Sequence, residues 1–373
     1  MSDDIPEPDR IEGAPHPRHT QHLIGQSAAE ATFLSAFNTD RLHHGWLITG
    51  PRGLGKATLA WRIARFLLAT PEDDGGFFAP PPPTSLDTPD DSPLAHRISA
   101  LSEPRLALVR RPWDDKAERL RADITVEEVR KLKSFFTLSS ADGGRRVAII
   151  DSVDDMTVSA ANALLKLLEE PPAKVTLLLI SHQPAALLPT IRSRCRELRL
   201  SPLSPPDLSD ALAQAGGEID PAQAQALAEL AGGSVGEAFR LTNLDGLKLY
   251  SVLIRLFGTL PRLDRHMALT VAEAAARKGA EAQFDLTVTL LDLFLARLAR
   301  AGTLHALPPE AAPGEAALLE RLAPTPAHAR PWADLAQTLG NRARRGRSVN
   351  LDPAALLMDM VLKIDETAAA LGT

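Results

Sequence analysis

The chain has a single cysteine, Cys195, among its 373 residues. One cysteine excludes an intrachain disulfide and any zinc site built from several cysteines. No stretch approaches the ~18 apolar residues of a membrane span, and the N-terminus lacks the basic-then-apolar order of a signal peptide. We therefore expect a cytoplasmic protein with no membrane contact and no zinc or other metal centre.

The composition is that of an ordinary globular protein, with 45% hydrophobic and 24% charged residues. A net charge of −6 argues against a generally basic nucleic-acid-binding surface. A chain of this length is expected to form more than one domain. We expect the histidines nearest the N-terminus to be solvated rather than metal-binding; these are His16, His19, His22, His43 and His44.

A glycine-rich loop with a lysine, Gly50-Pro-Arg-Gly-Leu-Gly-Lys56, follows an apolar run and precedes a helical pattern. This order is typical of a P-loop, in which backbone N–H groups and a helix N-terminus surround phosphate oxygens. The next residue is Ala57, where a P-loop has the hydroxyl that holds Mg²⁺. Thr58 carries a hydroxyl, but one helical residue later it points about 100° away. ATP or ADP binding is therefore expected to be weak or vestigial.

A second departure from an active nucleotide site follows the apolar run at 147–150. That run ends in Asp151, the position of a metal-side carboxylate, but the next residue is Ser152 rather than a glutamate. A hydroxyl is a far poorer base at pH 7 than a carboxylate. Asp154 and Asp155 are expected to cap the following helix. The predicted degenerate nucleotide site consists of Gly50, Gly53, Gly55, Lys56, Ala57, Thr58, Asp151 and Ser181.

Strands alternate with helices in the first half of the chain. Apolar runs lie at 46–48 and 106–109, and continuous runs of β-branched residues and leucine, typical of parallel strands covered on both faces, lie at 147–150 and 175–180. An apolar helical face at 161–168 and a capping box at 125–128 complete the pattern of a three-layer α/β domain over residues 23–201. Its ligand is expected at the carboxyl ends of the strands. Residues 70–105 are predicted to be a Pro/Asp-rich insertion, of which residues 70–92 form a surface loop.

The rest of the chain is predicted to be an arm and two helical regions. Residues 1–22 are rich in proline, histidine and charge, which indicates a flexible arm. Short helices separated by glycine pairs indicate a small helical lid at 202–245, and Ala/Leu-rich stretches indicate an all-helical domain at 246–373. Residues 324–331 are expected to form a loop. The basic run at 342–347 is expected to be a solvated helix end rather than a phosphate-contacting patch.

One combination of motifs carries a family resemblance. The stretch Ala160-Ala-Asn-Ala-Leu-Leu-Lys-Leu-Leu-Glu-Glu-Pro-Pro172, followed by Ser193-Arg194-Cys195, resembles the clamp-loader branch of the AAA+ ATPases over about residues 20–200. Within that branch the chain is more similar to the delta-prime subunits of bacterial DNA polymerase III than to the gamma/tau subunits. The resemblance implies an AAA+ P-loop module with a small helical lid and a C-terminal helical collar.

The resemblance also assigns roles to single residues. It implies that Arg194 is an arginine finger, which acts in trans on nucleotide held by a neighbouring subunit. Ser181 stands where the family places the residue that senses the γ-phosphate. Gly236 stands where the lid of active relatives carries an arginine, and the Pro/Asp-rich stretch replaces a four-cysteine zinc module found in many relatives.

The function implied is that of a hydrolysis-deficient subunit, with no activity of its own, in a DNA-directed DNA polymerase holoenzyme and its clamp-loading ATPase. Its partners would be gamma/tau and delta subunits in a hetero-oligomer, with the sliding clamp and primed DNA engaged through the complex. Two alternatives stay open: an active gamma-like ATPase subunit that hydrolyses ATP at Lys56, and a stand-alone binding module unrelated to replication.

Overall fold

The computed structural model describes residues 6–71, 81–137, 144–217 and 219–372. The chain forms two compact units. The first, called the sheet unit here, comprises Met1–Glu218 together with Gly233–Gly236, and the second, called the helical unit, comprises Ile219–Gly232 and Glu237–Thr373. The segment predicted as a lid at 202–245 is therefore divided between the two units.

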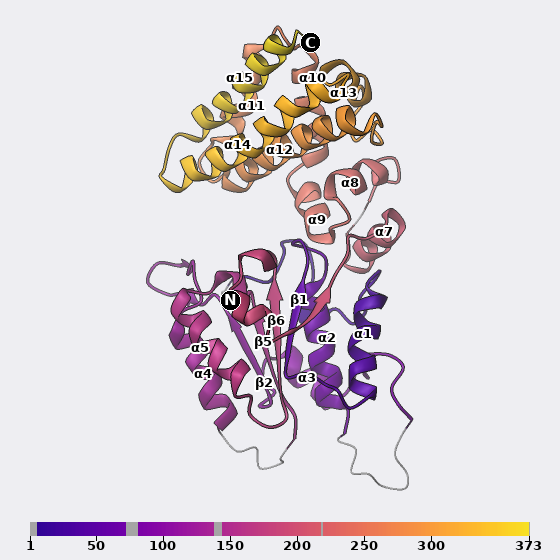
Figure 1. The fold of residues 1–373 in the computed structure, drawn as a ribbon, viewed down its shortest axis with the longest axis vertical. Coiled ribbons are helices and arrows are strands. Elements are labelled where there is room, and N and C mark those ends of the chain that lie inside the picture. The colour runs from indigo at the N-terminus through magenta and orange to yellow at the C-terminus, as the bar shows by residue number, and fades with distance from the viewer. Residues whose placement is uncertain (1–5, 72–80, 138–143, 218, 373) are drawn as a thin grey trace. The chain divides into compact units, whose positions relative to one another are not determined.

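A five-stranded parallel sheet forms the centre of the sheet unit (Figure 1), with strand order β2-β5-β6-β1-β7. Its strands are β1 (Gly45–Thr49), β2 (Leu106–Arg110), β5 (Arg146–Asp151), β6 (Val175–Ser181) and β7 (Arg196–Arg199). The four strands predicted from apolar runs are confirmed. Strand β7 was not predicted, because this edge strand buries only Leu198 and has no apolar run.

Helices cover both faces of the sheet, so the predicted three-layer α/β arrangement is confirmed (Figure 1). The helices on one face are α1 (Ser27–Asn38), α2 (Lys56–Ala69) and α3 (Pro93–Ser99), and those on the other are α4 (Val126–Thr137) and α5 (Val158–Glu169). Alternate residues of β1 enter the two cores: Trp46 and Ile48 lie in the first core and Leu47 in the second. This follows from the period of two in a strand.

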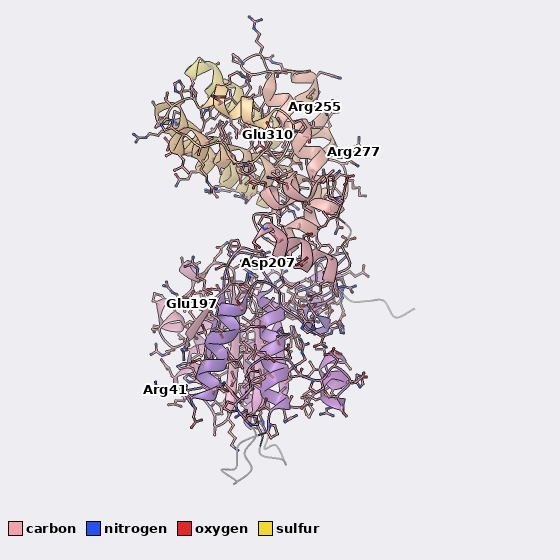
Figure 2. All side chains as sticks on the ribbon, turned by 90° about the vertical axis from the view of Figure 1, so that its right-hand side faces the viewer. Arg41, Glu197, Asp207, Arg255, Arg277 and Glu310 are labelled. Carbon is pink, nitrogen blue, oxygen red and sulfur yellow. The ribbon has the colours of Figure 1, made fainter. Side chains whose placement is uncertain are left out.

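The shorter elements of the sheet unit connect this framework. They are η1 (Pro17–His19), the β3 (Trp113–Asp114) and β4 (Arg119–Leu120) hairpin, η2 (Val153–Asp155), η3 (Pro184–Ala186), α6 (Pro189–Arg192) and α7 (Pro205–Gln214). On the outside of the unit, β7 carries Glu197 (Figure 2), whose carboxylate accepts a hydrogen bond from the Thr49 hydroxyl at 2.6 Å.

The N-terminal segment is not a flexible arm over residues 6–22, which corrects the prediction for the part of it that the structure describes. His16 is only 3% exposed, which also corrects its expected solvation, and its ring packs edge-on against Trp61 of α2. Two buried arginines of α2, Arg62 and Arg65, donate to backbone carbonyls of this segment. The segment lacks an apolar pattern because charges and backbone hydrogen bonds hold it.

The Pro/Asp-rich insertion contributes to the core at two points, and the first of them, Leu86, lies within the stretch at 70–92 that was expected to be a surface loop. Leu86 is 2% exposed and Ile98 of α3 is fully buried, and both join the core around α2. Residues 72–80 of this stretch lie outside the described residues.

Every element of the helical unit in the described residues is a helix, as predicted. These helices are α8 (Ala224–Ala231), α9 (Val235–Asn243, whose first two residues belong to the sheet unit), α10 (Gly246–Gly258), α11 (Arg265–Ala275), α12 (Glu281–Leu304), α13 (Glu315–Leu322), α14 (Pro326–Ser348) and α15 (Pro353–Leu371). None of the described helices is long and apolar enough to cross a membrane.

Helix α14 corrects one expectation and confirms another. The predicted loop at 324–331 is instead largely the start of this helix, with Pro326 in its first turn, where a missing N–H costs nothing. Pro331 lies inside the helix, next to the fully buried Trp332. The basic run at 342–347 is an exposed helix end, as predicted, and Arg342, Arg344 and Arg347 form surface ion pairs with Asp359, Asp292 and Asp285.

Candidate functional site

The P-loop joins β1 to α2 at the carboxyl end of the sheet, where α/β proteins bind their ligands. Gly50, Gly53 and Gly55 all have positive φ, at 138°, 75° and 88°, a conformation that other residues rarely adopt. A Cβ on Gly53 would lie 2.3 Å from Ser234 Oγ and 2.8 Å from Gly236 Cα. Glycine at this position thus allows a second segment of the chain to contact the loop.

Lys56 faces the loop that precedes it. Its ammonium donates to the carbonyl oxygens of Gly50 and Pro51 at 2.7 and 2.5 Å, and the residue is 3% exposed. Burial lowers the pKa of Lys56 to about 8, an effect that the charges of Asp151 and Asp154 partly oppose. The group expected to meet phosphate therefore satisfies the loop's own carbonyls.

The segment Gly233–Gly236 closes on the other half of the P-loop. Ser234 Oγ donates to the carbonyl of Arg52 at 2.9 Å, and the N–H of Gly236 donates to the carbonyl of Gly53 at 3.1 Å. Four successive loop carbonyls, from residues 50 to 53, thus accept hydrogen bonds from this chain's own donors. A Cβ on Gly236 would lie 2.8 Å from Gly53 Cα, so a larger residue has no room there.

Asp151 and Ser152 end β5 beside this loop. Burial and, to a lesser extent, the nearby Asp9 charge raise the pKa of Asp151 to about 7, while Lys56 opposes the shift. The Ser152 hydroxyl donates to Asp155 at 3.0 Å. A hydroxyl already paired with an acceptor does not provide a general base.

Ser181 is fully buried at the end of β6 and donates to Asp154 at 2.8 Å. Asp154 also accepts the N–H groups of His182 and Gln183 at 2.5 and 3.2 Å. Asp154 therefore holds the loop after β6, and the expectation that it caps the next helix is wrong. Thr157 caps α5 instead, by accepting from the N–H of Ala160.

The sequence analysis missed two residues near this edge. Burial and the positive charge of Lys56 lower the pKa of His182 to about 4. The Asp9 side chain is 1% exposed and is the strongest charged neighbour of Asp151. His182 could have been recognised as a candidate site residue from its place one residue after a buried strand. No feature of the sequence indicated that Asp9 lies at this edge.

The groups at this edge do not fit a magnesium nucleotide in the arrangement that the structure shows. Ala57 offers no oxygen to Mg²⁺, and Thr58 is buried within α2. The Lys56 ammonium is bonded to the loop, and Gly236 is packed against Gly53. Among the described residues no cluster of three or more His, Cys, Asp or Glu side chains is placed to hold a metal ion.

Arg194 lies in the loop between α6 and β7, near the opposite end of β1. Its carbonyl oxygen is 3.4 Å from where a Cβ on Gly45, the first residue of β1, would lie. The P-loop follows the last residue of β1, so the structure does not bring Arg194 and Lys56 together. The guanidinium is 36% exposed and is held by Glu169 at 2.9 Å and the Thr190 carbonyl at 3.1 Å. Burial raises the pKa of the adjacent Cys195 thiol to about 12.

Comparison with known families identifies the sheet unit. The family model described as "DNA polymerase III, delta subunit" matches residues 25–204. The match covers slightly less than half of the chain and supports a delta-prime-like clamp-loader subunit of DNA polymerase III over these residues. The predicted α/β fold class is confirmed by the five-stranded parallel sheet, whose strand β1 leads through the glycine-rich loop into α2.

Individual relatives agree with this assignment. The chain is 36% identical to DNA polymerase III subunit delta' of Pseudomonas aeruginosa over 152 residues, 41% of each chain. It is 31% identical to subunit delta' of Bacillus subtilis over 59% of this chain and 62% of that protein. It is 28% identical to subunit tau of Salmonella typhimurium over 72% of this chain and 40% of that protein. The matches thus span less than two thirds of each of these relatives.

Solved structures include a DNA polymerase III gamma subunit-related protein from Thermotoga maritima. The match covers 90% of this chain and 99% of the Thermotoga protein at 16% identity, with a TM-score of 0.35.

Proposed function

We propose that this chain acts as a delta-prime-type clamp-loader subunit that lacks ATP hydrolysis of its own and donates Arg194 to nucleotide held by a neighbouring gamma/tau subunit. The observation that carries the proposal is the position of Arg194. It sits in a Ser-Arg-Cys loop near the end of β1 opposite to the chain's own P-loop. An arginine in that place serves a site on another molecule better than its own.

The chemistry of the side chain supports this role. Arginine keeps its charge at any working pH and presents a planar fork of donors to phosphate oxygens. The Arg194 guanidinium is partly exposed, and it contacts the half-exposed Glu169 carboxylate, the Thr190 carbonyl and, at 3.5 Å, the Ser193 hydroxyl. Surface contacts of this kind stabilise a protein by at most about 1 kcal/mol, so a triphosphate can compete for the guanidinium.

The state of the chain's own P-loop supports the absence of hydrolysis. The metal-binding hydroxyl is replaced by Ala57, the base by Ser152, and the lid arginine by Gly236. In addition, Lys56 and Ser181 are both bonded within the chain. We place the chain in a hetero-oligomer with gamma/tau and delta subunits, in the cytoplasm, with the helical unit contributing to a collar. That assembly would load the sliding clamp on primed DNA during replication.

Co-purification tests the proposal directly. The tagged chain is expressed with gamma/tau and delta subunits from the same organism, and the complex is separated by gel filtration. We expect the chain to elute with both partners as one complex. Elution of the chain alone, while gamma/tau and delta associate with each other, would support a stand-alone binding module instead.

The intact glycines and lysine of the P-loop favour a second candidate, an active gamma-like ATPase. Steady-state ATP turnover of the isolated chain and of Lys56→Ala distinguishes the two candidates. We expect both proteins to stay at the background rate. Turnover of the wild-type chain that is lost on Lys56→Ala substitution would support the gamma-like candidate.

A further inference from the structure

We infer that residues 7–11 bind as an intramolecular ligand at the P-loop edge of the sheet, and that this segment keeps nucleotide away from the loop. The inference goes beyond the proposed function, because it concerns which part of the molecule closes the chain's own site. It stands whether or not Arg194 serves a neighbour.

Two carboxylates fix the segment at the carboxyl end of the sheet. Arg110, the last residue of β2, donates to Asp9 at 2.6 Å and to Glu7 at 2.8 Å. Arg110 is the register neighbour of Asp151, the last residue of β5. The segment therefore places two negative groups beside the position where an active site would have its metal-side carboxylate.

An apolar side chain of the segment, Ile11, then lies next to the residues that cover the P-loop. Ile11 Cδ1 is 2.7 Å from where a Cβ on Gly236 would lie, and that same Cβ position is 2.8 Å from Gly53 Cα. Leu23 Cδ1 is 2.6 Å from where a Cβ on Gly55 would lie. Ile11 therefore lies against the Gly236 segment that covers Gly53, and Leu23 lies against Gly55, so apolar side chains occupy space beside two of the loop's glycines.

A network of charges and backbone bonds holds the segment on α2. His16 lies 3.0 Å from Asp9, and Arg18 pairs with Glu7 at 2.6 Å. Arg65 donates to the carbonyls of Arg18 and Thr20 at 2.8 and 2.7 Å. Most of these groups are buried, and truncating one partner of a buried pair leaves the other uncompensated.

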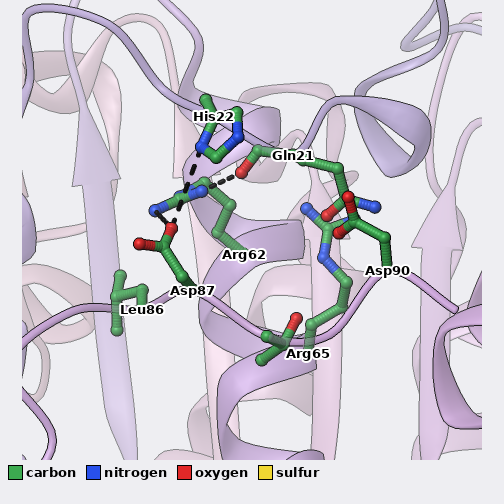
Figure 3. A pocket seen from close by; sticks show the side chains of 8 residues that line it. Gln21, His22, Arg62, Arg65, Leu86, Asp87 and Asp90 are labelled. Carbon is green, nitrogen blue, oxygen red and sulfur yellow. Dashed lines mark hydrogen bonds and ion pairs between the residues drawn. The ribbon is translucent and has the colours of Figure 1, made fainter. Parts of the chain in front are cut away.

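A further arginine of α2, one turn before Arg65, also holds the N-terminal segment (Figure 3). Arg62 donates to the carbonyl of Gln21 and, at 3.0 Å, to Asp87. The segment is therefore held on both sides of Ile11: by Arg110 before it, and by Arg65 and Arg62 after it.

This arrangement separates two explanations for a site that takes no nucleotide. If the lost hydroxyl and base were the cause, then Ala57→Thr with Ser152→Glu would restore binding. If the segment is the cause, that double variant stays closed, because Glu7 and Asp9 still repel a polyphosphate and Ile11 still lies against the segment that covers Gly53. Removing the segment's contacts would open the loop even with Ala57 in place.

The experiment titrates the full chain with a fluorescent adenine nucleotide, mant-ADP, in the presence of Mg²⁺. We expect no saturation up to about 1 mM for the wild type or for Ala57→Thr/Ser152→Glu. We expect Glu7→Gln/Asp9→Asn/Ile11→Ala to bind tighter than the wild type by about tenfold or more. The matched control is Asp245→Asn/Glu366→Gln/Leu269→Ala, which neutralises two carboxylates that pair with exposed lysines and truncates an exposed leucine. The control should behave as the wild type.

Thermal unfolding of each variant checks that it is folded. Should the triple variant lose its cooperative transition, Ile11→Ala alone replaces it, because Ile11 is 38% exposed and its truncation leaves every ion pair intact. The same direction of change is expected. The inference would be overturned if Glu7→Gln/Asp9→Asn/Ile11→Ala, or Ile11→Ala in its place, bound mant-ADP no more tightly than the wild type, and also if none of these proteins bound it. Restored binding in Ala57→Thr/Ser152→Glu alone would also overturn it. None of these outcomes bears on co-purification with gamma/tau.

Discussion

The two candidate centres of the sheet unit differ in how completely their polar groups are satisfied. At the P-loop edge, Lys56, Ser152 and Ser181 are nearly or fully buried, and each is bonded to an acceptor of the same chain. In the Arg194 loop the cation is partly exposed and is paired with one half-exposed carboxylate. The donors at the P-loop edge are already hydrogen-bonded within the chain, whereas the Arg194 guanidinium remains accessible to a ligand held by a partner.

This contrast matters because a buried group already bonded must lose its partner before it can bind a ligand, at a cost of about 1–3 kcal/mol for each group left unsatisfied. An exposed surface pair costs about 1 kcal/mol or less to break. Of these two regions, the Arg194 loop therefore has the polar group that a ligand can take at the lower cost. Four substitutions test this difference between the two regions.

Arg194→Ala is expected to have the largest effect. An arginine finger contributes about 10³-fold or more to phosphoryl transfer at the site it serves. We expect single-turnover ATP hydrolysis at the adjacent site of the reconstituted complex to fall by about that factor, measured with clamp and primed DNA present. Assembly by gel filtration should be unchanged.

Arg192→Ala is the matched control for that experiment, because Arg192 is an exposed arginine two residues earlier in the same short segment. It should leave hydrolysis close to the wild-type rate. Equal rates in the wild type and Arg194→Ala would remove the finger assignment and leave the two regions without a functional difference.

Asp151→Asn should stabilise the chain in a pH-dependent way. The folded-state pKa of Asp151 is about 7, against an ordinary value of 3.8, so the folded state binds more protons between these two values. The Asp151 contribution to stability then falls as pH rises through that window. Asparagine cannot ionise, so its advantage should be absent near pH 4 and reach about 4 kcal/mol above pH 8.

Urea unfolding at pH 4, 6 and 8 measures this effect. Asp334→Asn on α14, an exposed carboxylate, is the control and should show no comparable trend. An advantage for Asp151→Asn that is constant with pH would mean that the closed edge does not disfavour its own carboxylate charge.

Much of this framework could be predicted from sequence because it depends on local patterns. The strand at 147–150 and the helix at 126–137 follow from continuous apolar residues and a capping box. The closure of the P-loop could not, since Asp9 and Arg110 are 101 residues apart and Ser234 and Arg52 are 182 apart. Such contacts depend on the complete fold and leave no periodicity in the chain.

The errors in the prediction have the same origin. His16 was expected to be solvated because it lies among prolines and charges. One of these charged groups, Asp9, instead pairs with the His16 ring and helps to hold it in a buried position. Asp154 was expected to cap a helix because of its position, but its carboxylate accepts the N–H of His182 in the loop after β6 instead. For Arg194 the motif located the residue, and only the fold showed that it lies near the opposite end of β1 from Lys56.

Gly236→Ala should destabilise the sheet unit by about 1–3 kcal/mol. Its methyl group would lie 2.8 Å from Gly53 Cα, which is backbone, and 2.7 Å from Ile11 Cδ1, which is a side chain and can move. The control is Gly258→Ala, where a Cβ would meet nothing within 4 Å. That variant should be neutral or slightly stabilising by helix propensity. Urea unfolding midpoints compare the two, and a Gly236→Ala midpoint at or above that of Gly258→Ala would mean that the loop is not closely covered.

Glu169→Gln should have the smallest effect and is the sharpest test of the open region. Glu169 and Arg194 are both more than a third exposed, so removing the carboxylate should change the free energy of unfolding by less than about 1 kcal/mol, and salt should weaken even that. Glu170→Gln, the exposed neighbour in the sequence, is the control. If Glu169 only holds the guanidinium in the free chain, Glu169→Gln should leave hydrolysis by the assembled complex near the wild-type rate, where Arg194→Ala does not. A loss as large as that of Arg194→Ala would mean that the carboxylate orients the guanidinium during hydrolysis, and the Arg194 loop would then be as tightly organised as the P-loop edge.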